Sequence, residues 1–289
     1  MNQKDKTIMM TKISKASKKI FKRNGIFTLS ILLIFILFSS PDIIQAFPQF
    51  ISGGETISKI SDLLPSSSGD AIGCNPADLI TAINNANSNP GPDVINLPEN
   101  CSYELTTFDN FNSYYDYNGF PIITSAITIN ARGAKIKSLN DNMRAFEISP
   151  EGSLSINNLE IQDFESNDEG GAILNYGVLT VSSSTFFSNT AIKGGAIYNL
   201  GDATIYNSTF SENRACCCII KGADGGAINN TGTLNIINAT FSNNSAKRDG
   251  DTFYNAGGTI NLKNSITTTD AFGENCSGDP LIDGGGNLR

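Results

Sequence analysis

Three stretches of the chain are near-copies of one another: GGAILNYGVLTVSSSTFFSN from Gly170 to Asn189, GGAIYNLGDATIYNSTFSEN from Gly194 to Asn213, and GGAINNTGTLNIINATFSNN from Gly225 to Asn244. Their glycine doublets begin 24 and then 31 residues apart, because an insertion, ACCCIIKGAD, lengthens the second interval. A degraded copy follows at Gly250, and an earlier one lacks the doublet, so the clearest repeats cover 152–265. A fixed period of this size is typical of solenoid proteins.

Each unit contains short alternating runs, such as Leu179-Thr180-Val181, separated by turns rich in Gly and Asn. Strands of four or five residues cannot bury an apolar face within one unit. If the units stack as coils, each backbone pairs with the next coil and the apolar side chains align. The sequence therefore predicts an all-β fold, a single-stranded parallel β-helix of about six coils, right-handed because crossover connections are.

The register of the copies assigns a structural role to three kinds of position. The glycine doublets should form tight corners where φ is positive or backbones approach closely. The phenylalanines should form a column in the core, and the asparagines should stack at the next corner, bonded to their equivalents and tolerant of left-handed geometry. These positions are Gly170, Gly171, Gly194, Gly195, Gly225 and Gly226, then Phe186, Phe210 and Phe241, then Asn189, Asn213 and Asn244.

The N-terminal region predicts export. Eight of the 20 basic residues lie within 1–24, and an apolar run, IFTLSILLIFILF, follows from Ile26 to Phe38. This pattern is typical of a secretory signal over residues 1–46, cleaved after Ala46, with an uncleaved signal-anchor as the alternative. Residues 47–72 are interpreted as a linker and residues 73–289 as the β-helix domain. Membrane contact is expected only through the N-terminal segment, if it stays uncleaved.

The charge distribution argues against nucleic acid as a partner. The whole chain has a net charge of −8, but the part after Ala46 holds 12 basic and 26 acidic residues, a net charge of −14. Such a body repels phosphate backbones. The chain also has no His, which excludes a Ser-His-Asp triad, a Cys-His dyad and a His-ligated zinc site.

A short amphipathic helix is predicted at about 76–87, before the repeats. Asn75 is a good N-cap, Pro76 fits the first helical position, and Asp78 suits the positive end of the helix dipole. Leu79 and Ile83 fall on one face. Short strands follow at DVINL and SYEL, and the polar-aromatic segment FDNFNSYYDYNGF is interpreted as a loop.

Six cysteines in an exported chain suggest disulfides. Cys74 and Cys101 flank the predicted helix and form a candidate pair. Cys216, Cys217 and Cys218 lie together in the insertion, where an exposed loop with oxidisable thiols is favoured over a metal site, because neither His nor a CxxC partner is present. Their pairing stays open.

Asp249 and Asp251 are weak candidates for a metal site. Carboxylates at turns can hold Ca²⁺, and Arg214 and Arg248 follow equivalent asparagines, so an acidic surface with arginine is conceivable. The alternative is that these are solvated turn charges. No catalytic residue and no cofactor other than a weakly indicated Ca²⁺ is expected.

The GGAI and FxxN motifs, as in Gly194 to Ile197 and Phe210 to Asn213, resemble the repeats of chlamydial-type polymorphic outer membrane proteins. The segment from Cys74 to Leu105, with GPDVINLP from Gly91 to Pro98, is similar to the CSLREAI-type start of pectate-lyase-like β-helix proteins. The resemblance implies an exported right-handed β-helix whose helix caps the open N-terminal end. In polymorphic membrane proteins the β-helix is a passenger that ends in a membrane barrel.

The expected function is that of a secreted or cell-surface β-helix of a bacterium with an adhesive or carbohydrate-contacting role. Its expected partners are cell-envelope components or extracellular polysaccharide. The alternative is a Ca²⁺-dependent lyase that acts on acidic polysaccharide, with arginine as base; an enzyme is the less favoured interpretation.

Overall fold

The computed structural model describes residues 66–67, 72–111, 117–140, 142–216, 222–268 and 274–288. The predicted signal or signal-anchor over 1–46 lies outside these residues. Within the predicted linker, β1 (Ser66–Ser67) pairs in parallel with Asp93 and Val94. The remainder of the linker, apart from Ile72, also lies outside the described residues.

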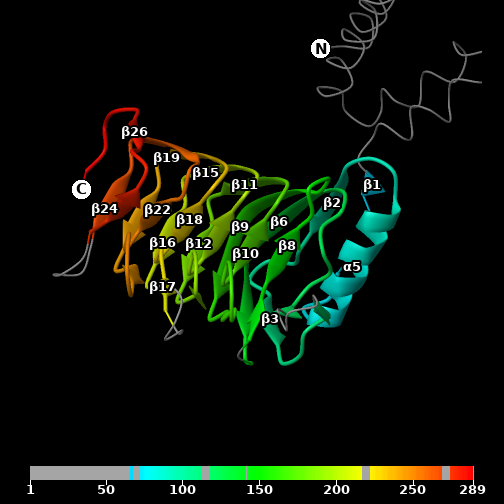
Figure 1. The fold of residues 1–289 in the computed structure, drawn as a ribbon. Coiled ribbons are helices and arrows are strands. Elements are labelled where there is room, and N and C mark those ends of the chain that lie inside the picture. Colours follow the sequence, from blue (N-terminus) through cyan, green and yellow to red (C-terminus); the bar gives the residue numbers. More distant parts are fainter. Residues whose placement is uncertain are drawn as a thin grey trace, which may run out of the picture. The chain divides into compact units, whose positions relative to one another are not determined.

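The chain forms a parallel β-helix whose consecutive coils stack on one another (Figure 1), with one shift in register between Asn130 and Ala134. Along one side of a 14-stranded sheet, eight strands follow one another: β2 (Asp93–Asn96), β6 (Ala126–Ser138), β9 (Ser153–Gln162), β11 (Val178–Ser182), β15 (Asp202–Tyr206), β19 (Thr233–Ile237), β23 (Thr259–Lys263) and β26 (Ile282–Asp283). The stack is therefore longer than the predicted six coils, because the layers built by β2 and β26 carry no recognisable copy of the repeat.

The same sheet continues with a second set of strands: β3 (Ser102–Leu105), β12 (Thr185–Phe187), β16 (Thr209–Ser211), β20 (Thr240–Ser242) and β24 (Ile266–Thr268). A second sheet consists of β8 (Phe146–Ile148), β10 (Ile173–Asn175), β14 (Ile197–Asn199), β18 (Ile228–Asn230), β22 (Phe253–Asn255) and β25 (Cys276–Gly278). Smaller sheets contain β13 (Thr190–Ala191), β17 (Arg214–Ala215) and β21 (Ser245–Ala246), and β4 (Asn110–Phe111), β5 (Tyr117–Asn118) and β7 (Met143–Arg144).

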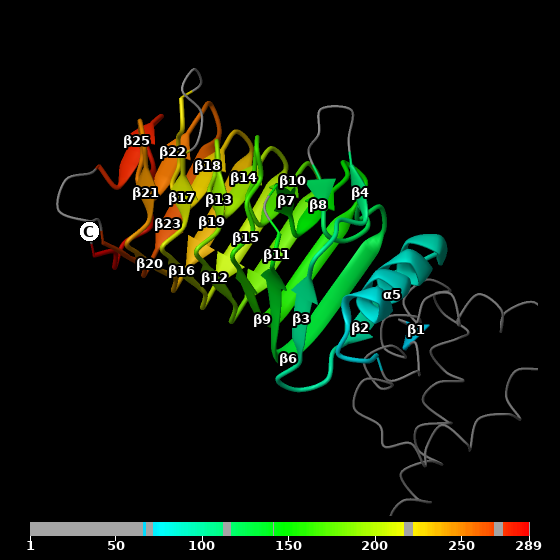
Figure 2. The ribbon, with the colours of Figure 1, turned by 90° about the horizontal axis from the view of Figure 1, so that it is seen from below.

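The helix α5 (Pro76–Ser88) lies across the N-terminal end of the stack, as predicted (Figures 1 and 2). The side chain of Asn75 accepts hydrogen bonds from the backbone N–H groups of Ala77 and Asp78. Leu79 and Ile83 are fully buried. Without this helix, the apolar interior of the first coil would face water, so α5 acts as a lid on the core. In the part of the chain that the structure describes, no helix is both long and apolar enough to cross a membrane.

The segment predicted as a polar-aromatic loop contains secondary structure. Asn110 and Phe111 pair in antiparallel with Asn118 and Tyr117, and β5 pairs with β7 of the next coil. Strands of two residues have no detectable periodicity in a sequence, which explains why this pairing was not predicted.

The apolar core runs through the middle of all coils as one continuous cluster. Where one column of stacked side chains in this core has a small residue, the neighbouring column has a large one. Where the phenylalanine column would continue, Thr267 stands above Phe241, and in the neighbouring column Phe253 stands above Ile228. The Phe253 ring meets the Phe241 ring edge-on at a centroid distance of 4.6 Å. The degraded fourth copy therefore fills the same interior with its large side chain moved to another strand.

Candidate functional site

The glycine doublets stand at a corner where two different physical constraints operate. The first glycine takes a left-handed conformation, with φ of 62° at Gly194. The second has no unusual φ, but a Cβ at Gly195 would collide with the carbonyl oxygen of Gly226 on the next coil. The two glycines are therefore required for different reasons, backbone conformation and close approach.

Beside this corner, Glu169, Lys193, Asp224 and Asp249 stack on successive coils. The Lys193 Nζ lies 2.7 Å from Glu169 Oε1 and 5.4 Å from the centre of the Tyr198 ring. Burial lowers the pKa of Lys193, but its hydrogen bond and the charge of Glu169 outweigh burial and raise it. This arrangement explains a lysine in a column of acids: it neutralises a carboxylate that the stacking brings close.

Arg248 neutralises the carboxylate of Asp224 in the same way. Its Nε donates a hydrogen bond of 2.8 Å to Asp224 Oδ1, and the carboxylate of Asp224 is almost fully buried. The hydrogen bond and charge of Asp224 raise the pKa of Arg248. Arg214, in contrast, stacks between Thr190 and Ser245 on another strand. The two arginines do follow equivalent asparagines, Asn213 and Asn244, but Ser245 and not Arg248 occupies the register position of Arg214 on the next coil.

The two weak metal candidates do not form a ligand set. Asp251 is buried, and its Oδ1 accepts a hydrogen bond of 2.8 Å from the backbone N–H of Ala246. Asp249 is half-exposed and its carboxylate pairs with Arg248 at 3.2 Å. Among the residues that the structure describes, no three His, Cys, Asp or Glu side chains are grouped to hold a metal ion. The carboxylates at this corner are engaged by cations and backbone.

The phenylalanines lie in one buried column. The centroid of the Phe210 ring lies 4.6 Å from that of Phe186 and 4.9 Å from that of Phe241, in both cases with the rings stacked nearly parallel. All three side chains are fully buried. The distances match the spacing between coils, so the column follows directly from the register of the strands.

The buried ladder at Asn189, Asn213 and Asn244 uses both polar atoms of each amide. The Oδ1 atoms of Asn213 and Asn244 each accept from the Nδ2 and from the backbone N–H of the asparagine on the preceding coil, at 3.0 to 3.1 Å. The Oδ1 of Asn189 accepts from the backbone N–H of Phe164 at 3.2 Å. The left-handed residue at this corner is not the asparagine but the one before it, for example Glu212 with a φ of 57°. The asparagine was predicted to tolerate that geometry; instead it satisfies the backbone that the turn leaves open.

A second buried ladder was missed. Asn175, Asn199 and Asn230 follow an Ile-x-Asn pattern after each corner, and Asn255 follows Phe-x-Asn at the equivalent place. The Nδ2 of each of the first three donates to the Oδ1 of the asparagine on the next coil at 2.6 to 3.1 Å. The Oδ1 of Asn175, which stacks on Ile148, is buried and has no hydrogen-bond partner among the described residues. The signal was present in the repeat, because these asparagines recur at the same spacing as the phenylalanines.

The cysteines behave differently at the two positions. Cys74 and Cys101 form a disulfide, with their Cα atoms 5.3 Å apart, that ties the start of α5 to the strand region before β3. Cys216 is buried and also disulfide-bonded, so it does not belong to an exposed thiol loop as predicted. Cys217 and Cys218 lie outside the described residues.

Next to the first disulfide, the Tyr103 hydroxyl donates a hydrogen bond of 3.1 Å to the carbonyl of Gly73. Burial and the charge of Asp78 raise the pKa of Tyr103 to about 12. This tyrosine therefore stays protonated in the folded protein well into the alkaline range.

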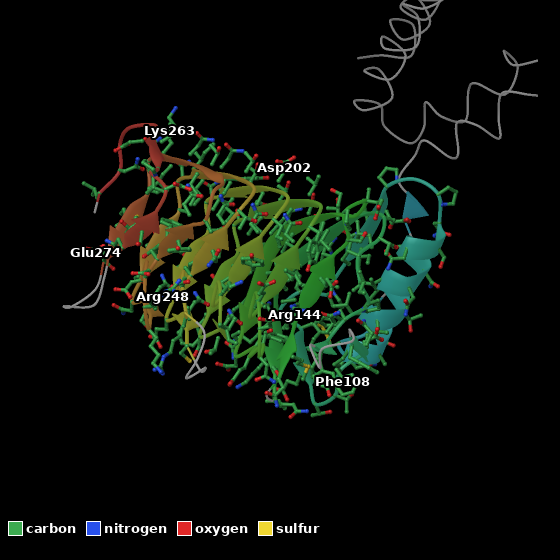
Figure 3. All side chains as sticks on the ribbon, in the orientation of Figure 1. Phe108, Arg144, Asp202, Arg248, Lys263 and Glu274 are labelled. Atoms are coloured by element: carbon green, nitrogen blue, oxygen red, sulfur yellow. A yellow bond between two sulfur atoms is a disulfide. The ribbon has the colours of Figure 1, made fainter. Side chains whose placement is uncertain are left out.

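A fully buried arginine supports the N-terminal coils. The guanidinium of Arg144 donates to Asn118 Oδ1 at 3.0 Å and to the carbonyl of Glu169 at 2.8 Å, and lies 3.5 Å from the Glu147 carboxylate. Figure 3 shows Arg144 inside the stack and Phe108 at its edge, both towards the helix end. No motif singled out Arg144, because it has no equivalent in the repeats.

The outward face of the long sheet carries a column of small polar side chains. Its members occupy the same register position on six successive coils and are all half-exposed: Thr128, Ser155, Thr180, Thr204, Asn235 and Asn261. We refer to these six residues as the polar column. Parallel strands lie about 4.8 Å apart, so the column presents hydroxyl and amide groups at that interval.

One comparison with known proteins gives a match. Residues 183–200 match the family model described as the Chlamydia polymorphic membrane protein (Chlamydia_PMP) repeat. The segment runs from the end of one coil through a glycine corner to the next β-strand, so the predicted resemblance to these repeats is confirmed there. No curated protein and no solved structure matches the chain. The similarity to pectate-lyase-like proteins at Cys74 to Leu105 stays a prediction.

Proposed function

We propose that this protein is an exported, non-catalytic β-helix displayed at the cell envelope of a bacterium, where it contacts polysaccharide or other envelope components. The matched repeat belongs to a family of surface-exposed outer membrane proteins, which supports the envelope location. The basic and apolar N-terminal segment supports export. Secretion into the medium is the alternative outcome if that segment is cleaved and nothing else retains the chain.

The observation that carries the contact role is the polar column. Its hydroxyls and amides repeat with the pitch of the coils, and strand pairing fixes their positions. A rigid, evenly spaced row of donors and acceptors suits a polymer whose own hydroxyls also repeat. Binding then costs little ordering entropy on the protein side.

The carboxylates at the glycine corner support a role without catalysis. Asp224 and Glu169 are paired with Arg248 and Lys193, and the Oδ1 of Asp251 is bound by backbone. A lyase of the alternative kind needs carboxylates available to Ca²⁺ and an arginine available to abstract a proton. At this corner the arginine already has a buried carboxylate as partner.

The test combines location and binding. Cells that produce the full chain are fractionated, and intact cells are treated with protease to detect surface exposure. Retention of the protein on columns of immobilised polysaccharides is then measured for wild type and for the double variant Thr180→Val/Thr204→Val. We expect the double variant to be retained at least about threefold less, because valine keeps the shape and strand preference but removes the hydroxyls.

Thr190→Val is the matched control, since Thr190 is half-exposed on β13, in a different sheet. Location in the cytoplasm would overturn the proposal. So would release of unsaturated products that absorb in the ultraviolet from polygalacturonate in the presence of Ca²⁺, abolished by Asp249→Asn and Asp251→Asn, because that result identifies a lyase.

A further inference from the structure

Three aromatic side chains gather on the surface near the N-terminal end. The Phe108 ring lies 4.3 Å from Tyr117 and 6.3 Å from Phe111, centroid to centroid, and Phe111 lies 6.0 Å from Tyr117. Phe108 is 45% exposed and Phe111 is 63% exposed, the latter close to the largest exposure of any large apolar side chain in the described chain. We refer to these three residues as the aromatic cluster; Figure 3 labels Phe108 at the edge of the stack.

Phe108 and Phe111 lie outside the apolar core, and Tyr117 packs against its edge. Phe111 and Tyr117 belong to the antiparallel pair β4 and β5, and Phe108 lies just before β4. Two neighbouring phenylalanines left largely in water do not contribute the stabilisation that burial of their apolar area would give, and a partner that covers them would gain it. A cluster of exposed apolar rings rimmed by polar residues is typical of a binding site. The cluster therefore calls for a ligand rather than a structural explanation.

The support beneath the cluster is rigid. Asn118, which neighbours Tyr117, is fully buried and donates 2.7 Å to Asn110 Oδ1 and 2.9 Å to Glu147 Oε2. The buried guanidinium of Arg144 donates to the same Asn118. This chain of bonds connects the hairpin to the interior of the stack, so the rings are held in place before any ligand binds.

Polar groups at the rim define the chemistry of the ligand. Asp109 lies between the two phenylalanines in sequence, is exposed, and accepts a hydrogen bond of 2.9 Å from Asn110 Nδ2. The exposed hydroxyls of Thr106 and Thr107 precede Phe108. A carboxylate beside the rings, on a body with a net charge of −14, disfavours an anionic ligand and accepts hydrogen bonds from neutral hydroxyls.

We propose that the aromatic cluster is a binding site for the pyranose rings of a neutral glycan. A pyranose has a C–H face that packs against an aromatic ring and a rim of hydroxyls that Asp109 and the threonines can bind. This inference rests on the proposed function in that the ligand is a polysaccharide, but it places the site on the hairpin and not on the polar column. It also narrows the ligand class from polysaccharide in general to uncharged polysaccharide.

The test is calorimetric titration of the full chain with cellohexaose, xylohexaose and mannohexaose, with an oligogalacturonate of equal length as the anionic probe. We expect at least one neutral hexasaccharide to bind and the oligogalacturonate to bind at least tenfold more weakly. Phe111→Ala and Phe108→Ala should each weaken the neutral ligand at least tenfold. Phe111→Tyr should stay within about threefold of wild type, because the ring face is kept.

Ile282→Ala is the matched control, because Ile282 is 54% exposed but lies in the C-terminal layer. Phe111 is an exposed side chain, so Phe111→Ala should fold, and thermal melting verifies this. Absence of binding to all three neutral probes overturns the inference, as does binding that Phe111→Ala leaves unchanged. Unchanged binding in Phe111→Ala with loss in Thr180→Val/Thr204→Val overturns the hairpin site but supports the polar column.

A second copy of the chain is the competing occupant. Sedimentation of wild type and Phe111→Ala at several concentrations decides between the two. If wild type dimerises and Phe111→Ala does not, the aromatic cluster is a subunit interface and the glycan site is overturned. A monomer in both, together with glycan binding, supports the inference.

Discussion

The repeated coils from Gly152 to Lys263 and the N-terminal end from Ile72 to Ile148 differ in how they satisfy their buried polar groups. In the coils, the asparagine ladders satisfy buried polar groups with equivalent groups one coil away, as Asn213 does between Asn189 and Asn244. At the N-terminal end the neighbours are unlike, so the structure uses a capping helix, a disulfide and a fully buried arginine. Where identical residues stack, they form hydrogen bonds with one another along the stack. At the irregular end, each buried polar group needs its own specific partner.

This difference has a consequence for function. The repeated coils can present only columns, because a side chain on one coil has its counterpart on the next. The irregular end can present a unique cluster, and the aromatic cluster is found there. The repeated coils are therefore better suited to binding a polymer with a repeating structure, and the N-terminal end is better suited to binding a ligand at a single local site.

The largest effect is expected in the repeated core. Phe210→Asp places a carboxylate between the stacked rings of Phe186 and Phe241, at a fully buried position. We expect the free energy of unfolding to fall by more than about 5 kcal/mol and cooperative unfolding to disappear. Circular dichroism during heating measures this. Phe187→Asp, at the adjacent half-exposed position, should retain a cooperative transition; a melt like that of wild type in Phe210→Asp would contradict the column.

The next largest effect should come from the irregular end. Arg144→Leu removes a donor from Asn118 Oδ1 and from the Glu169 carbonyl, and it removes the cation that lies beside the Glu147 carboxylate. Removing one partner of a buried ionic network typically costs about 3 to 5 kcal/mol, which urea unfolding can measure. Arg214→Leu, at an exposed position, should change stability by less than about 0.5 kcal/mol. Equal effects in the two variants would remove the distinction between the regions.

The disulfide of the end is expected to contribute somewhat less. It closes a loop with a sequence separation of 27, for which the chain-entropy relation gives about 3.5 kcal/mol. Cys74→Ala/Cys101→Ala should lower the urea midpoint accordingly. Reductant added to this double variant should lower it further, since Cys216 is also disulfide-bonded. An unchanged midpoint in the double variant would show that α5 needs no covalent tether.

The smallest effect concerns pH. The pKa of Tyr103 is raised from 10.0 to about 12, first by burial and then by Asp78. Above pH 10 the unfolded tyrosine releases its proton while the folded one retains it, so stability falls as pH rises from 10 to 12. We expect a loss of about 2 kcal/mol relative to Tyr103→Phe, which cannot titrate. Urea unfolding of both proteins at pH 9 and pH 11.5 measures it, and parallel curves would contradict the burial of this hydroxyl.

Much of the fold could be predicted because the repeat aligns residues with their spatial neighbours. The stacking partners of Phe210 and Asn213 follow from counting one period along the chain. The second ladder at Asn199 was available by the same counting and was overlooked. The left-handed position was assigned one residue too late, at Asn213 and not Glu212, because composition indicates that a turn needs an asparagine but does not distinguish its conformational role from a bonding role.

The aromatic cluster could not be predicted in the same way. Phe108, Phe111 and Tyr117 lie in a segment without periodicity, and their proximity depends on the antiparallel pairing of β4 with β5. The role of Arg144 could not be predicted for a related reason. Its partners Asn118 and Glu169 lie 26 residues before it and 25 residues after it, and no sequence pattern connects them.

By itself, then, the sequence determined the coil, its corners and its columns, because period, register and backbone pairing are linked whenever identical units stack. Only the tertiary structure decided the contacts at places where adjacent coils carry unlike residues. There Lys193 pairs with Glu169, and Phe253 fills the volume left by Thr267. There, too, the β4–β5 hairpin region exposes its aromatic rings. These features depend on contacts between unlike residues, whose distances no period along the chain encodes.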